Sequence, residues 1–198
     1  MVAGGRDGEE PNGFRMVMIQ RDLVPVWGIT TVFALALAAM FTFLKTFVMH
    51  TGIGSVGGFF SAYAGAALGL RIFLGWLPDR VGAKRVLFPS LVTLAVGFLA
   101  LAGANDERTV LLAGALCGAG HGYTFPLLFG MVVNRARDAD RGTAMSIYTA
   151  LFDVGVLIGG PLLGAVIERF GYTAMYATVA ALVGAGMVGF AVADRGRH

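Results

Sequence analysis

The chain has 198 residues, of which 57% are hydrophobic and 14% charged, and its formal net charge is +3. Soluble domains average roughly 45–50% apolar and about 25% charged residues, so a water-soluble fold could not cover this much apolar surface. The basic residues lie in short loops between apolar runs, which favours a lipid bilayer over nucleic acid as the partner.

Six apolar runs organise the chain, each near the length of about 20 residues that crosses a bilayer. They span about residues 24–49, 53–77, 86–104, 109–133, 143–167 and 173–193. Residues 1–22 mix glycine, acids and bases without a signal-peptide core, and we interpret them as a flexible cytoplasmic lead-in. The sequence therefore predicts an all-α, six-helix transmembrane domain over residues 23–194, with a cytoplasmic tail at 195–198.

Lys and Arg are distributed unevenly between the two sides of this topology. One side receives Arg6, Arg15, Arg21, Arg80, Lys84, Arg85, Arg135, Arg137, Arg141, Arg195 and Arg197. The other side receives Arg108 and Arg169. Because basic loops stay in the cytoplasm, we expect a multi-pass protein of a bacterial inner membrane with both termini inside.

The spacing G-x-x-x-[DE]-R-x-G occurs twice. The copies are Gly75, Asp79, Arg80 and Gly82, and Gly164, Glu168, Arg169 and Gly171, offset by 89 positions. Three hydrophobic segments separate the copies, so they lie on opposite faces of the membrane. This predicts a 3+3 inverted repeat.

The first junction contains a carboxylate in an unusual place. Pro78 is expected to end the second helix, which puts Asp79 near a helix C-terminus, where the dipole disfavours a negative charge. A compensating cation is then expected from Arg80, Lys84 or Arg85. Gly82 allows a turn with positive φ before the third helix.

This stretch resembles the cytoplasmic loop signature of the major facilitator superfamily, G-x-x-x-D-R-x-G-R-[RK]. The matching residues are Gly75, Asp79, Arg80, Gly82, Lys84 and Arg85, and Ala83 departs from the pattern. The resemblance implies a charge network of Asp79, Arg80 and Arg85 that locks one state of an alternating-access cycle. Because the family has twelve helices in two halves, it also implies that this chain is one half and works with a second six-helix half.

Two features favour the carboxy-terminal half. Residues 146–164 resemble the eleventh helix of bacterial members, and the fourth helix lacks the early Arg often seen in the amino-terminal half of efflux members. Gly160, Pro161 and Gly164 partly resemble the antiporter signature G-P-x-x-G-G, with Ala165 in place of the last Gly. Pro161 predicts a kink.

Glycines four residues apart predict close helix packing. The pairs are Gly65 and Gly69, Gly114 and Gly118, Gly155 and Gly159, and Gly160 and Gly164. The alternative for the last pair is a bend that moves during function.

Polar residues inside apolar runs are functional candidates. Asp153, near the middle of the fifth helix, is interpreted either as a proton-coupling or substrate residue or as a helix-to-helix hydrogen bond. His121 has the same two interpretations, with Tyr123 close by, and the resemblance implies that the fourth helix lines a central cavity. Lys45 and Arg71 are expected to extend toward the membrane surfaces.

The sequence thus predicts secondary active transport of a small molecule or ion and not an enzyme. It has neither a phosphate-binding glycine loop with Lys nor Cys/His metal spacing, so we expect no cofactor. One alternative is a six-helix intramembrane serine protease resembling the rhomboids, with Ser55 as nucleophile and His121 as base. Another is a non-transporting membrane scaffold or remnant.

Overall fold

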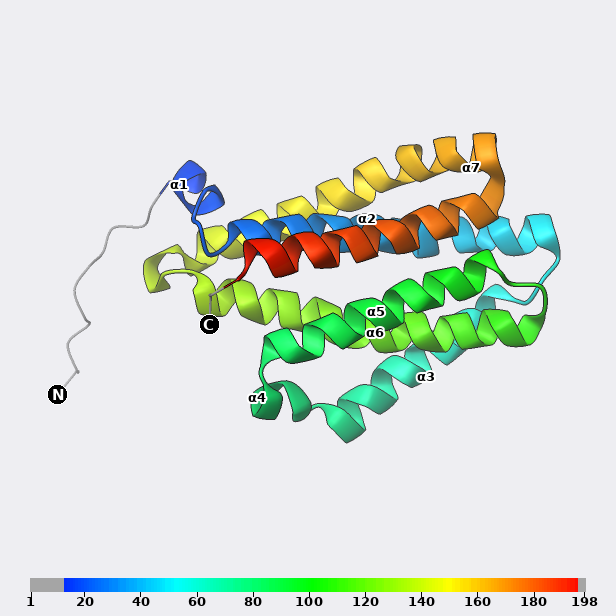
Figure 1. The fold of residues 1–198 in the computed structure, drawn as a ribbon, viewed down its shortest axis with the longest axis horizontal. Coiled ribbons are helices and arrows are strands. Elements are labelled where there is room, and N and C mark those ends of the chain that lie inside the picture. The colour runs from blue at the N-terminus through cyan, green and yellow to red at the C-terminus, as the bar shows by residue number, and fades with distance from the viewer. Residues whose placement is uncertain (1–12, 196–198) are drawn as a thin grey trace.

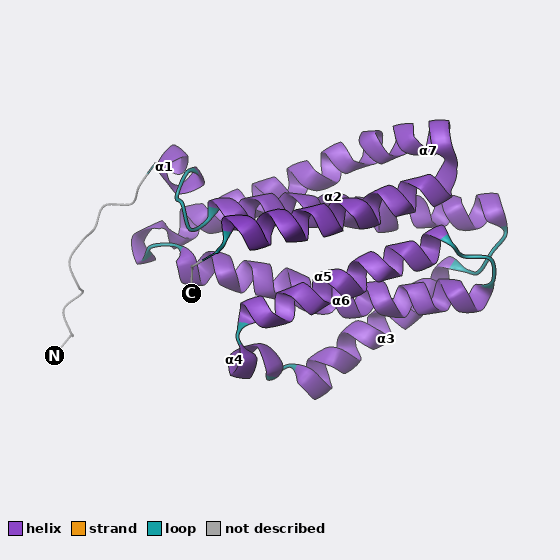
Figure 2. Cartoon of the chain, in the orientation of Figure 1, coloured by secondary structure: helices purple, strands orange, loops and turns teal. Residues whose placement is uncertain are grey.

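The computed structural model describes residues 13–195, and all the regular elements in this part of the chain are helices (Figure 2). They are α1 (Phe14–Met18), α2 (Val24–Thr51), α3 (Val56–Leu74), α4 (Leu77–Val81), α5 (Ala83–Ala102), α6 (Glu107–Arg135), the 3-10 turn η1 (Asp138–Asp140) and α7 (Arg141–Ala193). The all-α fold predicted from the apolar runs is confirmed.

The 53-residue α7 consists of two membrane-length arms. Gly171, with φ 79° and ψ 177°, is the residue of α7 whose backbone is not helical. Figure 1 shows the ribbon reversing direction near this point, so residues 141–170 and 172–193 run antiparallel. Together with α2, α3, α5 and α6, the two arms make the six predicted apolar segments.

The two triplets of helices interleave. α2 packs mainly against α7, and α3 packs against α6, while α5 contacts both α6 and α7. The consecutive helices α2 and α3 hardly touch. Gly82 and Gly171, equivalent in the 89-residue repeat, both have positive φ, 94° and 79°. The same glycine-dependent turn therefore joins the second and third helices of each triplet.

One end of the bundle gathers α1, α4, η1 and the end of α7 (Figure 1). The α2–α3 loop, the α5–α6 loop and the Gly171 turn gather at the other end. Arg80 in α4 and Arg135 at the end of α6 therefore lie at the same end. This is the grouping expected from the uneven Lys and Arg distribution.

Glycines allow α3 and α6 to approach closely. On α6, Gly114, Gly118 and Gly122 face Phe59, Tyr63 and Ala67 of α3, so the two helices match residue for residue at four-residue spacing. A Cβ on Gly118 would lie 2.1 Å from the carbonyl oxygen of Tyr63. This contact brings the side chains of Tyr63 and His121 to one place.

Gly155 and Gly159 play the corresponding part between α7 and α2, where an added Cβ would lie 2.7 Å from the Cβ of Ala34 and of Ala38, respectively. In contrast, Gly65 and Gly69 have open space where a Cβ would be. The prediction of close packing was wrong for that pair, because four-residue spacing does not reveal which face of a helix meets a neighbour.

The lead-in is more ordered than expected where it is described. Phe14–Met18 form α1, in which Val17 is buried, and the Trp27 indole Nε1 donates a hydrogen bond to the Met18 carbonyl over 3.1 Å. An apolar contact and a buried indole therefore hold this segment against the bundle. The rest of the predicted lead-in, residues 1–12, and tail residues 196–198 lie outside the described part.

Candidate functional site

Pro78 lies in the first turn of a new short helix and does not end the preceding one. α3 stops at Leu74, and α4 starts at Leu77 with Pro78 in its first turn. Asp79 therefore sits in the first turn of α4, and its expected place at a helix C-terminus was wrong. The physical reason is that the fixed φ of proline suits the start of a helix as well as the end of one.

The expected cation partner of Asp79 is not found either. Among residues 13–195, Asp79 forms no ion pair. The Arg80 guanidinium lies over the Trp76 ring, 4.9 Å from its centroid, and Lys84 binds Asp194. Arg80 and Lys84 thus have other contacts, which sequence spacing could not reveal.

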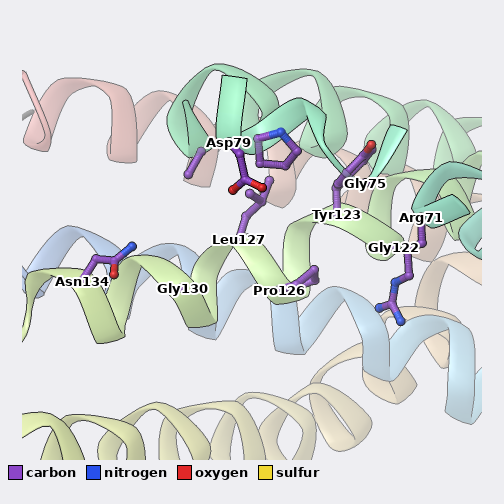
Figure 3. A pocket seen from close by; sticks show the side chains of 11 residues that line it. Arg71, Gly75, Asp79, Gly122, Tyr123, Pro126, Leu127, Gly130 and Asn134 are labelled. Atoms are coloured by element: carbon purple, nitrogen blue, oxygen red, sulfur yellow. The ribbon is translucent and has the colours of Figure 1, made fainter. Parts of the chain in front are cut away.

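Asp79 instead faces a cavity of about 510 Å³ between the α3–α4 junction and α6. Figure 3 shows its carboxylate directed from α4 toward α6, with Asn134 near one end of the cavity and Arg71 near the other. Gly75, Pro78, Gly130 and Leu127 also line this space. Both Asp79 and Arg71 are exposed, so an incoming polar group could reach them.

Tyr123 lies in the wall of the same cavity. Its hydroxyl donates a hydrogen bond to the carbonyl of Leu74, the last residue of α3. This bond satisfies a carbonyl left free at the helix end and ties α6 to the junction. The structure therefore separates Tyr123 from His121, although the two are close in sequence.

A buried ion cluster that the sequence analysis missed closes this end of the bundle. The Asp194 side chain is fully buried, with Lys84 Nζ at 2.7 Å from Oδ2 and the Arg135 guanidinium donating two hydrogen bonds of 2.8 and 3.0 Å. Burial opposes ionisation of Asp194, but the bonds from Arg135 and Lys84 outweigh it and hold the pKa of Asp194 below its ordinary value. The cluster joins the ends of α5, α6 and α7. The sequence feature that could have predicted this cluster is Asp194 itself, a single acid directly after the last apolar run.

His121 is a half-buried residue of α6 that contacts α2 and α3. Its Nδ1 forms a hydrogen bond with the Tyr63 hydroxyl of α3. The imidazole also lies against Phe33, with ring centroids 5.5 Å apart, and against Phe125 at 6.1 Å. This is the helix-to-helix hydrogen bond that was one of its two interpretations, and it leaves Nε2 outside that bond.

Aromatic rings continue from His121 in both directions, and we call this set the aromatic strip. Its members are Phe41, Phe60, Tyr63, His121, Phe33, Phe125, Phe152, Tyr148 and Phe129. The strip crosses from α2 and α3 through α6 to the first arm of α7. Its terminal members Phe41 and Phe129 are exposed, so both ends of the strip reach the surface of the bundle.

Asp153 directly follows Phe152, a member of the strip, in the sequence of α7. It is exposed and lines a hollow of about 470 Å³ with Met145, Ser146, Thr149 and Ala150. A carboxylate at this depth is costly against lipid. The face that carries it must therefore meet water, a polar partner or a ligand.

The predicted bend residues lie inside the first arm of α7. α7 keeps helical φ/ψ through Gly160, Pro161 and Gly164. An added Cβ would meet open space at Gly160 and would lie 3.7 Å from Phe43 at Gly164. These two glycines thus do not form the tight contact seen at Gly155 and Gly159.

The two residues of the protease alternative are not assembled into a catalytic pair. Ser55 is the N-cap of α3, where its hydroxyl oxygen accepts a 3.1 Å hydrogen bond from Gly58 N. His121 Nδ1 is bonded to Tyr63 instead. A serine nucleophile needs its base within hydrogen-bond reach, which this arrangement lacks.

Comparison with known proteins agrees with this architecture. The family model described as Major Facilitator Superfamily matches residues 19–197. The chain is 29% identical over 160 residues to an uncharacterized MFS-type transporter of Pseudomonas aeruginosa, which covers 81% of this chain and 40% of that protein. It is 27% identical over 191 residues to the uncharacterized MFS-type transporter YwfA of Bacillus subtilis, covering 94% of this chain and 46% of that one. The chain thus spans less than half the length of these relatives.

Proposed function

The chain belongs to the major facilitator superfamily, and we propose that it forms one six-helix half of a secondary transporter that moves a small solute by alternating access. The observation that supports this best is the interleaved 3+3 repeat, with equivalent glycine turns at Gly82 and Gly171 at opposite ends. Alternating access consists largely of rocking one such unit against another.

The second half is a further part of the proposal. It can come from further sequence of a longer protein, from a separate chain or from a second copy. The resemblance of residues 146–164 to an eleventh helix favours the carboxy-terminal position for this half. The bacterial relatives support a location in the inner (plasma) membrane. The uneven Lys and Arg distribution favours the Arg80 and Arg135 end in the cytoplasm.

We assign the conformational lock to Asp79, Arg80 and Arg85. The Asp79 carboxylate projects into the 510 Å³ cavity without an ion pair among the described residues, so it can accept a donor from the opposing half when that end closes. Tyr123 and Gly75 position the junction, while Lys84 belongs to the Asp194 cluster that braces it. Removing the Asp79 charge would then favour the state that is open at this end.

Proton coupling is assigned to His121 and Asp153. They are the titratable residues that lie closest to the middle of their spans. His121 belongs to the aromatic strip, and Asp153 directly follows its member Phe152 in the sequence. Gly160, Pro161 and Gly164 are proposed as the flexible part of the first α7 arm. Gly155 and Gly159 anchor the same arm against α2.

The test is reconstitution into proteoliposomes with and without a candidate six-helix partner, scanning solutes under an imposed proton gradient. We expect gradient-driven accumulation only with the partner, and we expect Asp153→Asn to abolish it. The matched control is Glu107→Gln, which removes an exposed acid in the first turn of α6. Accumulation that survives Asp153→Asn would refute the coupling role. If a functional partner shows no solute movement at all, the scaffold alternative gains support.

A further inference from the structure

The hollow at Asp153 has an unusual set of polar groups. Ser146 Oγ donates its proton to the Gly142 carbonyl at 3.1 Å, and Thr149 Oγ1 donates to the Met145 carbonyl at 3.1 Å. A hydroxyl has one proton, so both side chains present only lone pairs to the hollow. The carboxylate of Asp153 adds two acceptor oxygens. The polar side chains of the hollow therefore accept hydrogen bonds and donate none.

The charge of the hollow is also uncompensated. Within residues 13–195, Asp153 has no ion pair. A carboxylate at this depth needs a cation, a proton or water. A ligand that brings both positive charge and N–H donors would supply the missing charge and hydrogen-bond partners for these acceptors.

Apolar side chains accompany the acceptors of the hollow, because Met145 and Ala150 also line it. The ring of Phe152, the residue preceding Asp153, lies 5.7 Å from that of Phe125 and 6.4 Å from that of Phe33. Aromatic faces attract cations through their quadrupole and stack against flat rings. An elongated ligand could place its charged end at Asp153 and its body along the aromatic strip.

We propose that the Asp153 hollow is the subsite for the ammonium end of an organic cation with N–H donors and an apolar or aromatic body. This inference rests on the proposed transport function, because it names the substrate class of that transporter. It excludes anions, for which the hollow offers neither a donor nor a positive charge.

The test is equilibrium binding to the full chain in nanodiscs of neutral lipid at pH 7. The probe is radiolabelled 1-naphthylmethylamine, which is protonated at this pH. The competitors are its N,N,N-trimethyl analogue, the neutral 1-naphthalenemethanol and the anion 1-naphthoate. The variants are Asp153→Asn, Asp153→Glu and the control Glu107→Gln.

We expect Asp153→Asn to weaken amine binding at least about tenfold, as for loss of a charge-assisted hydrogen bond, while the affinity for the alcohol stays unchanged. Asp153→Glu should restore part of the loss, and Glu107→Gln should bind like the wild type. The trimethyl analogue and the anion should bind more weakly than the amine.

Equal amine affinity in the wild type and Asp153→Asn would overturn the proposal, as would naphthoate or the trimethyl analogue binding as well as the amine. Loss of alcohol binding in Asp153→Asn would also overturn it, since the carboxylate would then act by supporting the fold or by pairing with another helix. The transport proposal can fail separately from this one. In that case the chain would bind the amine through Asp153 but show no gradient-driven transport.

Discussion

Gly118→Ala is expected to separate α3 from α6. The added Cβ would lie 2.1 Å from the Tyr63 carbonyl oxygen and 2.7 Å from the Tyr63 Cα. Both atoms belong to the backbone of a helix, so no side chain can rotate away from the methyl group. Carbon and oxygen atoms repel strongly below about 3 Å, so the helices must move apart by about 1 Å.

This displacement has a cost that can be estimated. Extra methyl groups in a well-packed interior destabilise proteins by about 1–3 kcal/mol, and the separation also weakens the dispersion contacts along Gly114 and Gly122. A melting temperature falls by roughly 2–4 °C for each kcal/mol in chains of this size. We therefore expect a decrease of about 2–12 °C, together with disturbance of the bond between Tyr63 and His121.

The assay uses the single cysteine of the chain. Cys117 is fully buried, so a thiol-reactive fluorophore reports unfolding of the reconstituted protein during heating. The matched control is Gly65→Ala on α3, where no atom lies within 4 Å of the added Cβ. The control should melt at or above the wild-type temperature, because alanine favours a helix more than glycine does.

A melting temperature for Gly118→Ala equal to that of Gly65→Ala would refute the reasoning. It would mean that α3 and α6 are not in close backbone contact at Gly118. The positions of Tyr63 and His121 in the aromatic strip would then also be in doubt.

Three further predictions concern the charged end of the bundle. Asp194→Asn should destabilise the chain by about 3–5 kcal/mol in the same assay, because Lys84 and Arg135 lose a buried partner. Since the pKa of Asp194 lies below its ordinary value of 3.8, its stabilisation should be complete above about pH 4 and decline as pH falls further; an unchanged acid profile in Asp194→Asn would contradict this. Asp79→Asn should shift the inward- and outward-open populations, measured by cysteine accessibility from each side, without abolishing membrane insertion; unchanged accessibility would count against the lock. Cysteines placed at Arg80 and Arg135 should label from the same side of the membrane, and labelling from different sides would disprove the topology.

Several features of the fold could be predicted from sequence because they depend on local properties. Apolar run length predicted the helical segments, and the repeated spacing around Gly82 and Gly171 predicted equivalent turns, which both have positive φ. The close contact at Gly118 was predicted as well, but Gly65 shows that the same spacing can face open space.

The candidate site was less accessible from sequence. For Asp79, the predicted helix position and cation partner were both wrong. Pro78 lies in the first turn of α4 rather than ending α3, and Lys84 binds an acid 110 residues away in the chain. Residues that meet only after the two triplets interleave leave no local pattern. Tyr63 was not recognised as the partner of His121 for this reason.

From the sequence by itself, one can predict that the chain lies in a lipid bilayer, that it has six apolar segments and where its repeat lies. These features depend on the hydrophobic length of single segments and on the local spacing of glycine and charged residues. Only the tertiary structure decided which helix faces which. That choice depends on where backbones can approach closely, and it brought Asp194 to Lys84 and Arg135, His121 to Tyr63, and Phe125 to Phe152.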